Sequence, residues 1–324
     1  MERLDRFMAR ANAAYYATHD PFKDFTTAPE ISQVFGEILG AWAAVTWDLI
    51  GRPDPVLLVE AGPGRGTLMA DALRAVALVA PAFHAAAQLH LIESSPRLRS
   101  IQAERLPGAT WHDRFATVPD GSLLLLANEF LDALPIRQFV QRNSRWFERF
   151  VANGQFVEAA TVPPCSDHDG EGIREINEPA LDLARSLGQR FTHYAGAALF
   201  LDYGPEHSGF GDTLQAIREA SPADPLATPG SADITAHVDF ASFAAVARHA
   251  GATTQGPVPQ GKFLARLGLF QRTDRLARGQ PGERAVALID AAQRLAEPNR
   301  MGRLFKALAV CHPGCPPLPG FESA

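Results

Sequence analysis

The segment Glu60–Thr67 has residue types and spacing suited to ligand binding. In it, Gly62, Gly64 and Gly66 follow a short apolar run that ends in an acid. Glycines between a buried strand and a helix let the backbone approach a ligand closely. The pattern is G-x-G-x-G, whereas dinucleotide sites carry G-x-G-x-x-G, and Glu60 would repel an anionic pyrophosphate. The segment therefore favours a ligand with an ammonium group, and S-adenosylmethionine fits it better than NAD.

Two later acids are candidates for the nucleoside part of such a ligand. Glu93 ends the second expected strand, where an acid in nucleotide-binding α/β folds accepts hydrogen bonds from ribose hydroxyls. The alternative is an acid at a helix start, satisfied by Ser94, Ser95 or the helix dipole. Asp113 follows the third expected strand and can reach the adenine amino group, unless it lies in a plain surface loop.

A third group of polar residues, Asn128, Glu129 and Asp132, follows the fourth expected strand. We assign Asn128 to the cofactor and the two carboxylates to the substrate, although a solvated loop is the alternative. Methyl transfer is an in-line displacement that needs a nucleophile held at near-attack distance. Two carboxylates can hold a guanidinium in this way, because its N–H donors match carboxylate oxygens in a fork.

His237 is a further candidate, either as a base or as a residue that orients substrate. Asp233 and Thr235 precede it and suit helix capping, so a structural role at a helix start is the competing interpretation.

The alternation of strands and helices predicts how these residues are positioned. Apolar runs and three-to-four periodicity alternate through the chain, which indicates crossovers and a doubly wound, mostly parallel sheet of the Rossmann-like α/β class. A period-two segment at 137–161 predicts an inserted antiparallel meander, and 204–230 has the composition of a long loop or lid. The expected helices are 3–16, 29–49, 68–79, 96–106 and 178–194, and the expected strands are 56–60, 88–92, 109–111, 122–127, 197–203 and 301–310.

Composition limits the class of protein. The 324 residues carry 30 lysines and arginines against 36 acids, a net charge of -6, which argues against nucleic acid as a partner. No apolar run approaches the roughly 18 residues of a membrane span. Residues 1–16 have no leader pattern, so we expect a cytoplasmic location. Three cysteines argue against a disulfide framework, and the pair at 311–315 offers too few soft ligands for zinc, so we expect no metal.

Several strings across nearly the whole chain resemble the MidA family of S-adenosylmethionine-dependent methyltransferases. This family includes a mitochondrial enzyme that dimethylates an arginine of a respiratory complex I subunit during assembly. The strings are Asp24–Gln33, Glu60–Leu68, Asn128–Ile136, Gly211–Gln215, Asp233–Phe240 and Gln260–Leu264.

The resemblance implies a class I methyltransferase fold and a protein-arginine activity. It makes Gly62, Gly64 and Gly66 the cofactor loop, Glu93 the ribose ligand, and Glu129 with Asp132 the substrate side. One departure is that Lys23 alone separates Asp20-Pro21-Phe22 from Asp24-Phe25, which is shorter than the family pattern. The expected organisation is a helical flap at 1–50, a methyltransferase core at 51–136 and 196–324 with a lid near 204–236, and an insert at 137–195.

Three other functions stay open on the sequence. Fold and cofactor loop do not select a substrate, so a small-molecule N- or O-methyltransferase is the first rival. A non-catalytic assembly factor that binds the cofactor is the second. A nicotinamide oxidoreductase is disfavoured by Glu60 and by the glycine spacing. The oligomeric state and the number of methyl groups added are left open.

Overall fold

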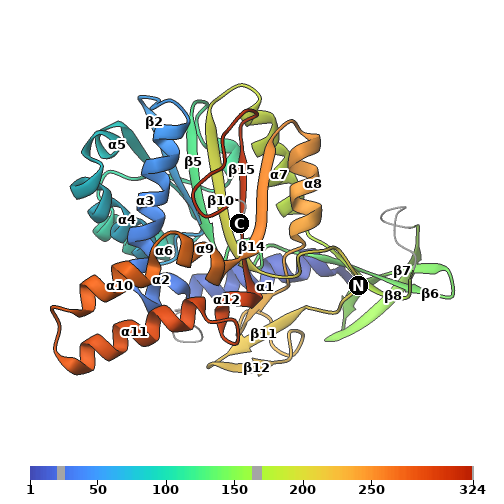
Figure 1. The fold of residues 1–324 in the computed structure, drawn as a ribbon. Helices are drawn as coiled ribbons and strands as arrows, with labels where there is room; N and C mark the ends of the chain where they lie inside the picture. Colours follow the sequence, from blue (N-terminus) through green and yellow to red (C-terminus); the bar gives the residue numbers. More distant parts are fainter. Residues whose placement is uncertain (20–25, 163–169, 323–324) are drawn as a thin grey trace.

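A computed structural model describes residues 1–19, 26–162 and 170–322 (Figure 1). Its centre is a seven-stranded sheet in the order β14-β15-β10-β5-β2-β3-β4. The run from β10 to β4 is parallel, while β15 and β14 are antiparallel to their neighbours. The predicted doubly wound class is confirmed. The strands are β2 (Val56–Ala61), β3 (Ala87–Ile92), β4 (Thr110–His112), β5 (Leu123–Asn128), β10 (Gly196–Tyr203), β14 (Thr253–Pro259) and β15 (Phe305–Cys311).

Helices cover both faces of this sheet, and its strands β2, β5 and β15 are buried along their whole length, as expected of strands covered on both sides. Leu58 packs in the same core as Trp42 of α3, whereas Val59, one residue on, faces the core that contains Phe243 of α8. The helices on the first side include α3 (Gln33–Leu49), α4 (Thr67–Val79), α9 (Gln260–Arg266), α10 (Leu269–Ala277) and α11 (Gly282–Ala296), and those on the second are α7 (Glu178–Phe191) and α8 (Phe240–His249). Further helical elements are α5 (Pro81–Ala86), α6 (Pro96–Arg105), η2 (Phe115–Thr117) and α12 (Met301–Leu304).

The N-terminal helices differ from the prediction at one point. Helix α1 (Leu4–Thr18) is as expected, but the single helix expected at 29–49 is two helices, α2 (Ala28–Ile31) and α3. The break is at Ser32, whose backbone is extended at φ -150° and whose Oγ accepts a hydrogen bond from the Val34 N–H. Ser32 therefore caps α3 and stops α2, as serine does at helix starts.

A second sheet projects away from the central one on the right of Figure 1. It contains the predicted meander, whose turns at Asn143-Ser144 and Asn153-Gly154 have positive φ. Strand β1 joins it from the N-terminal region by pairing with β7. The strands are β1 (Glu2–Arg3), β6 (Arg137–Arg142), β7 (Arg145–Ala152), β8 (Gln155–Thr161) and β9 (Gly172–Ile176).

The segment expected to be a long loop contains part of a third sheet, formed by β11 (Gln215–Arg218), β12 (Ser221–Ala223) and β13 (Asp233–Thr235). Asp233 and Thr235 are therefore in a strand paired with β11, and the interpretation that they cap a helix is wrong. Helix α8 begins at Phe240 and is capped by Asp239, whose Oδ1 accepts the Ser242 N–H at 2.9 Å.

The last strand starts later than predicted. The strand expected from 301 begins at Phe305, after the short helix α12. The shortened stretch around Lys23 and the cysteine at 165 lie outside the described residues. Over the described ranges, no helix combines the length and the apolar character needed to cross a membrane.

Candidate active site

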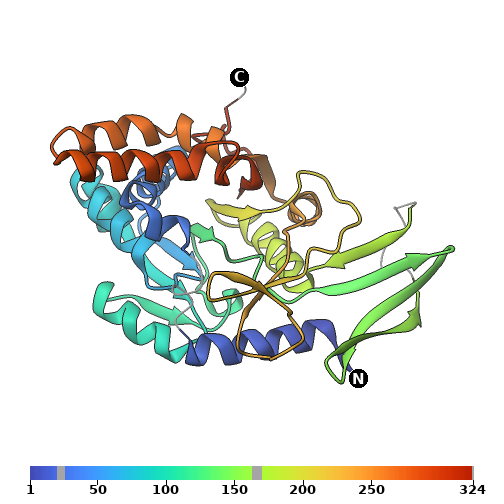
Figure 2. The ribbon, with the colours of Figure 1, turned by 90° about the horizontal axis from the view of Figure 1, so that it is seen from below.

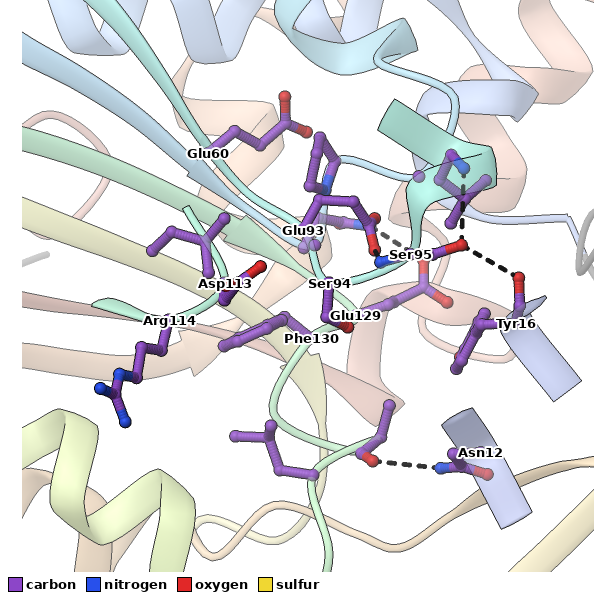
Figure 3. Close-up of a pocket in the computed structure, with 18 of the residues that line it drawn as sticks. Asn12, Tyr16, Glu60, Glu93, Ser94, Ser95, Asp113, Arg114, Glu129 and Phe130 are labelled. Atoms are coloured by element: carbon purple, nitrogen blue, oxygen red, sulfur yellow. Dashed lines mark hydrogen bonds between the residues drawn. The ribbon is translucent and has the colours of Figure 1, made fainter. Parts of the chain in front are cut away.

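A cavity of about 800 Å³ opens at the carboxyl ends of β2, β3, β4 and β5 (Figure 3). This edge is where open α/β sheets bind ligands. Side chains from α1 and from the stretch of α7 between Pro179 and Ser186 form other parts of its wall. In Figure 2, α1, in dark blue, runs along the lower edge of the view, and Ser95 Oγ, in the segment after β3, donates to the Tyr16 carbonyl of α1 at 3.2 Å. The predicted lid region, 204–236, contributes no residue to the lining.

The glycine loop takes conformations that side chains rarely adopt. The φ angles of Gly62, Gly64 and Gly66 are 66°, 53° and 76°. A Cβ on Gly62 would lie 2.9 Å from Cδ2 of Phe130. Gly62 and Gly64 line the cavity, whereas Gly66 stands behind them at the start of α4. The exposed backbone of this loop therefore forms one wall of the cavity.

Two buried oxygens at this wall have no hydrogen-bond partner among the described residues: Glu60 Oε2 and Asn128 Oδ1. Glu60 lines the cavity with only 3% of its surface exposed, and burial raises the pKa of its carboxyl to about 8. An unpartnered buried oxygen costs stability. Both oxygens consequently suit a ligand that brings N–H donors, such as an ammonium group.

Glu93 lies between the glycine loop and α1 (Figure 3). Its Oε1 accepts the Ser95 N–H at 2.7 Å and its Oε2 accepts Gln102 Nε2 at 3.4 Å, while burial raises the pKa of the carboxyl. Glu93 therefore makes the local hydrogen bond expected of an acid at a helix start, and it also lines the cavity. Asp113 lines it too, but its side chain is 79% exposed and pairs with Arg99 at 2.6 Å.

Glu129 turns into the cavity directly after β5. Its φ of 50° is uncommon for a residue with a side chain. Its Oε1 accepts hydrogen bonds from the Ala28 N–H at 3.2 Å and from Asn128 Nδ2 at 3.0 Å. Burial, reinforced by the negative charge of Asp132, raises the pKa of Glu129 to about 7. Glu129 is therefore a carboxyl group whose charge changes near neutral pH.

The other two predicted substrate-side residues do not line the cavity. Asp132 is 6% exposed and lies behind the wall, where burial raises its pKa to about 6. The ring of His237 packs edge-on against Tyr203, with centroids 5.4 Å apart, and burial lowers its pKa. The His237 N–H donates to Thr213 Oγ1 at 2.9 Å, which is a structural contact.

The sequence patterns did not predict that α1 forms part of the cavity wall. Asn12 and Tyr16 line the cavity, and each also reaches β13. The Tyr16 hydroxyl donates to Asp233 Oδ1 at 2.8 Å, across 217 residues, and Asn12 Nδ2 donates to the Ile234 carbonyl at 2.8 Å, across 222. The apolar periodicity of α1 indicates a buried face, but it carries no signal for polar partners so distant in the chain.

Cys311 is buried in β15 and Cys315 is partly exposed, and both are free thiols. In the part of the chain that the structure describes, no three His, Cys, Asp or Glu side chains are grouped to hold a metal ion.

Comparison with known families identifies the protein class. A family model described as "Putative S-adenosyl-L-methionine-dependent methyltransferase" matches residues 38–258, more than half of the chain. The chain belongs to this methyltransferase family. A Drosophila melanogaster relative, named protein arginine methyltransferase NDUFAF7 homolog, mitochondrial, is 34% identical over 95% of this chain and 80% of its own length. The Homo sapiens protein named protein arginine methyltransferase NDUFAF7, mitochondrial, is 32% identical over 95% of this chain and 79% of its own length.

A solved structure gives the cofactor of this methyltransferase. A Burkholderia thailandensis protein bound to S-adenosyl-homocysteine matches 99% of this chain and 89% of its own, with 28% identity and a TM-score of 0.78. S-adenosylmethionine is the cofactor, and the class I fold is confirmed. The unpartnered oxygens of Glu60 and Asn128 and the open glycine backbone fit the amino acid part of this cofactor.

The expected cytoplasmic location is wrong. The Drosophila melanogaster, Xenopus tropicalis and Homo sapiens relatives are all named as mitochondrial proteins. The expectation depended only on the composition of residues 1–16, which these names outweigh.

Proposed function

We propose that this methyltransferase transfers methyl groups to an arginine side chain of a partner protein. The names of its relatives support an arginine acceptor. The observation that carries the proposal is the carboxyl group of Glu129, which the chain buries in the wall of the cofactor cavity and holds there by two hydrogen bonds. A buried carboxylate is the partner that a guanidinium needs.

We assign the residues that bind S-adenosylmethionine to its separate parts. The backbone of Gly62 and Gly64 faces the methionine part, and Gly66 starts the helix behind it. Glu60 and Asn128 accept N–H groups of the methionine part, because each has an oxygen free for a donor. Glu93 is assigned to the ribose hydroxyls. Asp113 is assigned to the adenine amino group and shares its charge with Arg99.

On the substrate side of the cavity, Glu129 is the residue that we assign to binding of the acceptor. Bound S-adenosylmethionine supplies an electrophilic methyl group. The ionised Glu129 carboxylate binds the acceptor guanidinium and orients one nitrogen toward that group, and such positioning can contribute about 7 to 11 kcal/mol to catalysis. A carboxylate with a pKa near 7 is also suited to take up the proton that the alkylated nitrogen loses. Asp132 raises this pKa from behind the wall, and we assign His237 no part in the chemistry.

We propose a respiratory complex I subunit as the acceptor protein, because the family resemblance implies one, and it is therefore the first partner to test. The experiment incubates methyl-labelled S-adenosylmethionine and this enzyme with lysate from cells that lack its gene, and then hydrolyses the labelled material to identify the modified residue.

Each outcome of that experiment is informative. Label in methylated arginine of one protein supports the proposal. Label confined to small molecules contradicts it and favours a small-molecule N- or O-methyltransferase. Cofactor binding without transfer to any component favours a non-catalytic assembly factor.

A further inference from the structure

The loop 129–135, which carries Glu129 into the cavity, contains no helix or strand but is firmly bound by its surroundings. Asp202, near the end of β10, lies beneath it with 1% of its surface exposed. One oxygen of this residue, Oδ2, accepts three consecutive backbone N–H groups, those of Phe130 at 3.1 Å, Leu131 at 2.8 Å and Asp132 at 3.3 Å. These are the three residues that directly follow Glu129.

The second oxygen of Asp202 is also used, since Oδ1 accepts the Tyr203 N–H at 2.9 Å. Four backbone donors therefore surround one buried carboxyl group, an arrangement that favours its anion. Burial and the nearby charges of Asp132 and Glu129 act in the opposite direction and raise the pKa of Asp202. The backbone donors offset only part of this rise in pKa, so the contact with the loop depends on the two carboxyl oxygens as hydrogen-bond acceptors and does not require the charged form.

Other side chains hold the carbonyl groups of the same loop. Asn177 Nδ2 donates to the Leu131 carbonyl at 2.9 Å and to the Leu134 carbonyl at 3.3 Å, and Asn12 Nδ2 donates to the Ala133 carbonyl at 3.2 Å. These carbonyl bonds begin at Leu131, whereas the N–H bonds to Asp202 begin at Phe130, so Asp202 holds the residue directly next to Glu129.

We propose that Asp202 is a positioning residue for methyl transfer, an inference that rests on the proposed role of Glu129. A left-handed φ in a residue with a side chain persists only when the surroundings hold it. The Glu129 N–H is bonded to the Leu201 carbonyl at 2.9 Å, and the next three N–H groups are bonded to Asp202. Asp202 thus holds the turn that directs the Glu129 carboxylate into the cavity.

The test measures three properties of Asp202→Ala and Asp202→Asn: the rate of label transfer from saturating S-adenosylmethionine into lysate protein, the affinity for S-adenosylhomocysteine, and hydrogen exchange in residues 129–135. We expect the alanine variant to lose about 10²-fold in rate, as a misplacement of about 1 Å produces, with unchanged cofactor affinity and faster exchange in the loop. The asparagine variant retains an oxygen for the loop N–H groups and recovers most of the rate.

Asp239→Ala is the matched control, because it removes a carboxylate that caps α8 away from the cavity. It should lose stability but transfer label at the normal rate. Full activity of Asp202→Ala, or asparagine and alanine variants that are equally slow, would overturn the inference. If the alanine variant does not fold, Asp202→Ser replaces it, because its shorter side chain withdraws the oxygen from the loop, and the same loss of rate is required. A wild-type enzyme that labels no protein refutes the proposed function instead.

Discussion

The Oε1 atom of Glu129 lies 3.2 Å from the backbone nitrogen of Ala28, the first residue of α2. These residues are 101 positions apart, and the bond joins the N-terminal helical region to the loop after β5. The orientation of the proposed substrate-binding carboxylate therefore depends on a segment that contributes nothing to the central sheet.

Replacing Glu129 with glutamine should suppress transfer without affecting cofactor binding. The amide keeps the shape of the side chain but loses the charge that binds a guanidinium, a bond worth about 1.5–3 kcal/mol. We expect a rate lower by roughly 10- to 150-fold, measured by label incorporation, with unchanged S-adenosylhomocysteine affinity by calorimetry. Glu175→Gln is a control, because this carboxyl group lies outside the cavity lining. An active Glu129→Gln enzyme would remove Glu129 from the site.

The pH dependence of transfer should follow the same group. Burial raises the pKa of Glu129 from 4.5 to about 7, so the carboxyl is protonated and uncharged below that pH. Because only the charged form binds a guanidinium, kcat/KM should rise with pH through about 7. In Glu129→Gln this rise should be absent from the remaining activity, and an identical profile in the two proteins would argue against the assignment.

Cofactor binding should release a proton from Glu60. With a pKa near 8, this carboxyl is mostly protonated in the free protein at pH 7. The ammonium group of the ligand favours the ionised form, so binding drives the proton into the buffer. Calorimetry of S-adenosylhomocysteine in phosphate and in Tris should give different heats at pH 7, and Glu60→Gln should remove the difference. Equal heats for the wild-type protein would contradict this role.

Gly64→Val should abolish measurable cofactor binding. The residue has φ 53° and its backbone lines the cavity, so a branched side chain both strains the loop and fills the ligand space. Gly154→Val is the matched control: Gly154 has φ 70° in a hairpin of the second sheet, outside the cavity. Both variants should lose stability, but only the first should lose S-adenosylhomocysteine affinity in calorimetry.

Removal of the Glu93 side chain should weaken nucleoside-containing ligands. Loss of a charge-assisted bond to ribose corresponds to about 1.5–3 kcal/mol, or roughly 10- to 150-fold in Kd for S-adenosylhomocysteine. Binding of free methionine should be unaffected by Glu93→Ala, and an equal loss for methionine would exclude a ribose role. Asp113→Ala should have a smaller effect, because its carboxylate is already paired with Arg99.

Local patterns were sufficient to predict the elements around the glycine loop. An apolar run that ends in Glu60 and is followed by alternating glycines specifies a strand, a turn and a helix within a dozen residues. Asp202 shows what such patterns omit. It is the penultimate residue of an apolar strand and has no motif of its own, and its role depends on β10 lying beside β5 in a register that pairs Leu201 with Asn128. Strand order is a long-range property that a single sequence does not encode locally.

The pair Glu129 and Asp132 illustrates a second limit. Their spacing suggests two carboxylates that act together on one substrate. The left-handed turn at Glu129 directs this side chain into the cavity, while Asp132 lies behind the wall. Backbone conformation at one residue therefore separates groups that are close in the sequence.

The contact between α1 and β13 has a consequence for biosynthesis. Tyr16, which lines the cavity, leaves the ribosome 217 residues before Asp233, its hydrogen-bond partner in β13. Until β13 has been synthesised, α1 lacks the strand on which it docks, although the glycine loop and β2 to β5 are already complete. A nascent chain thus acquires its cofactor-facing backbone early and the opposing wall late, so an intact binding chamber forms only in the final third of translation.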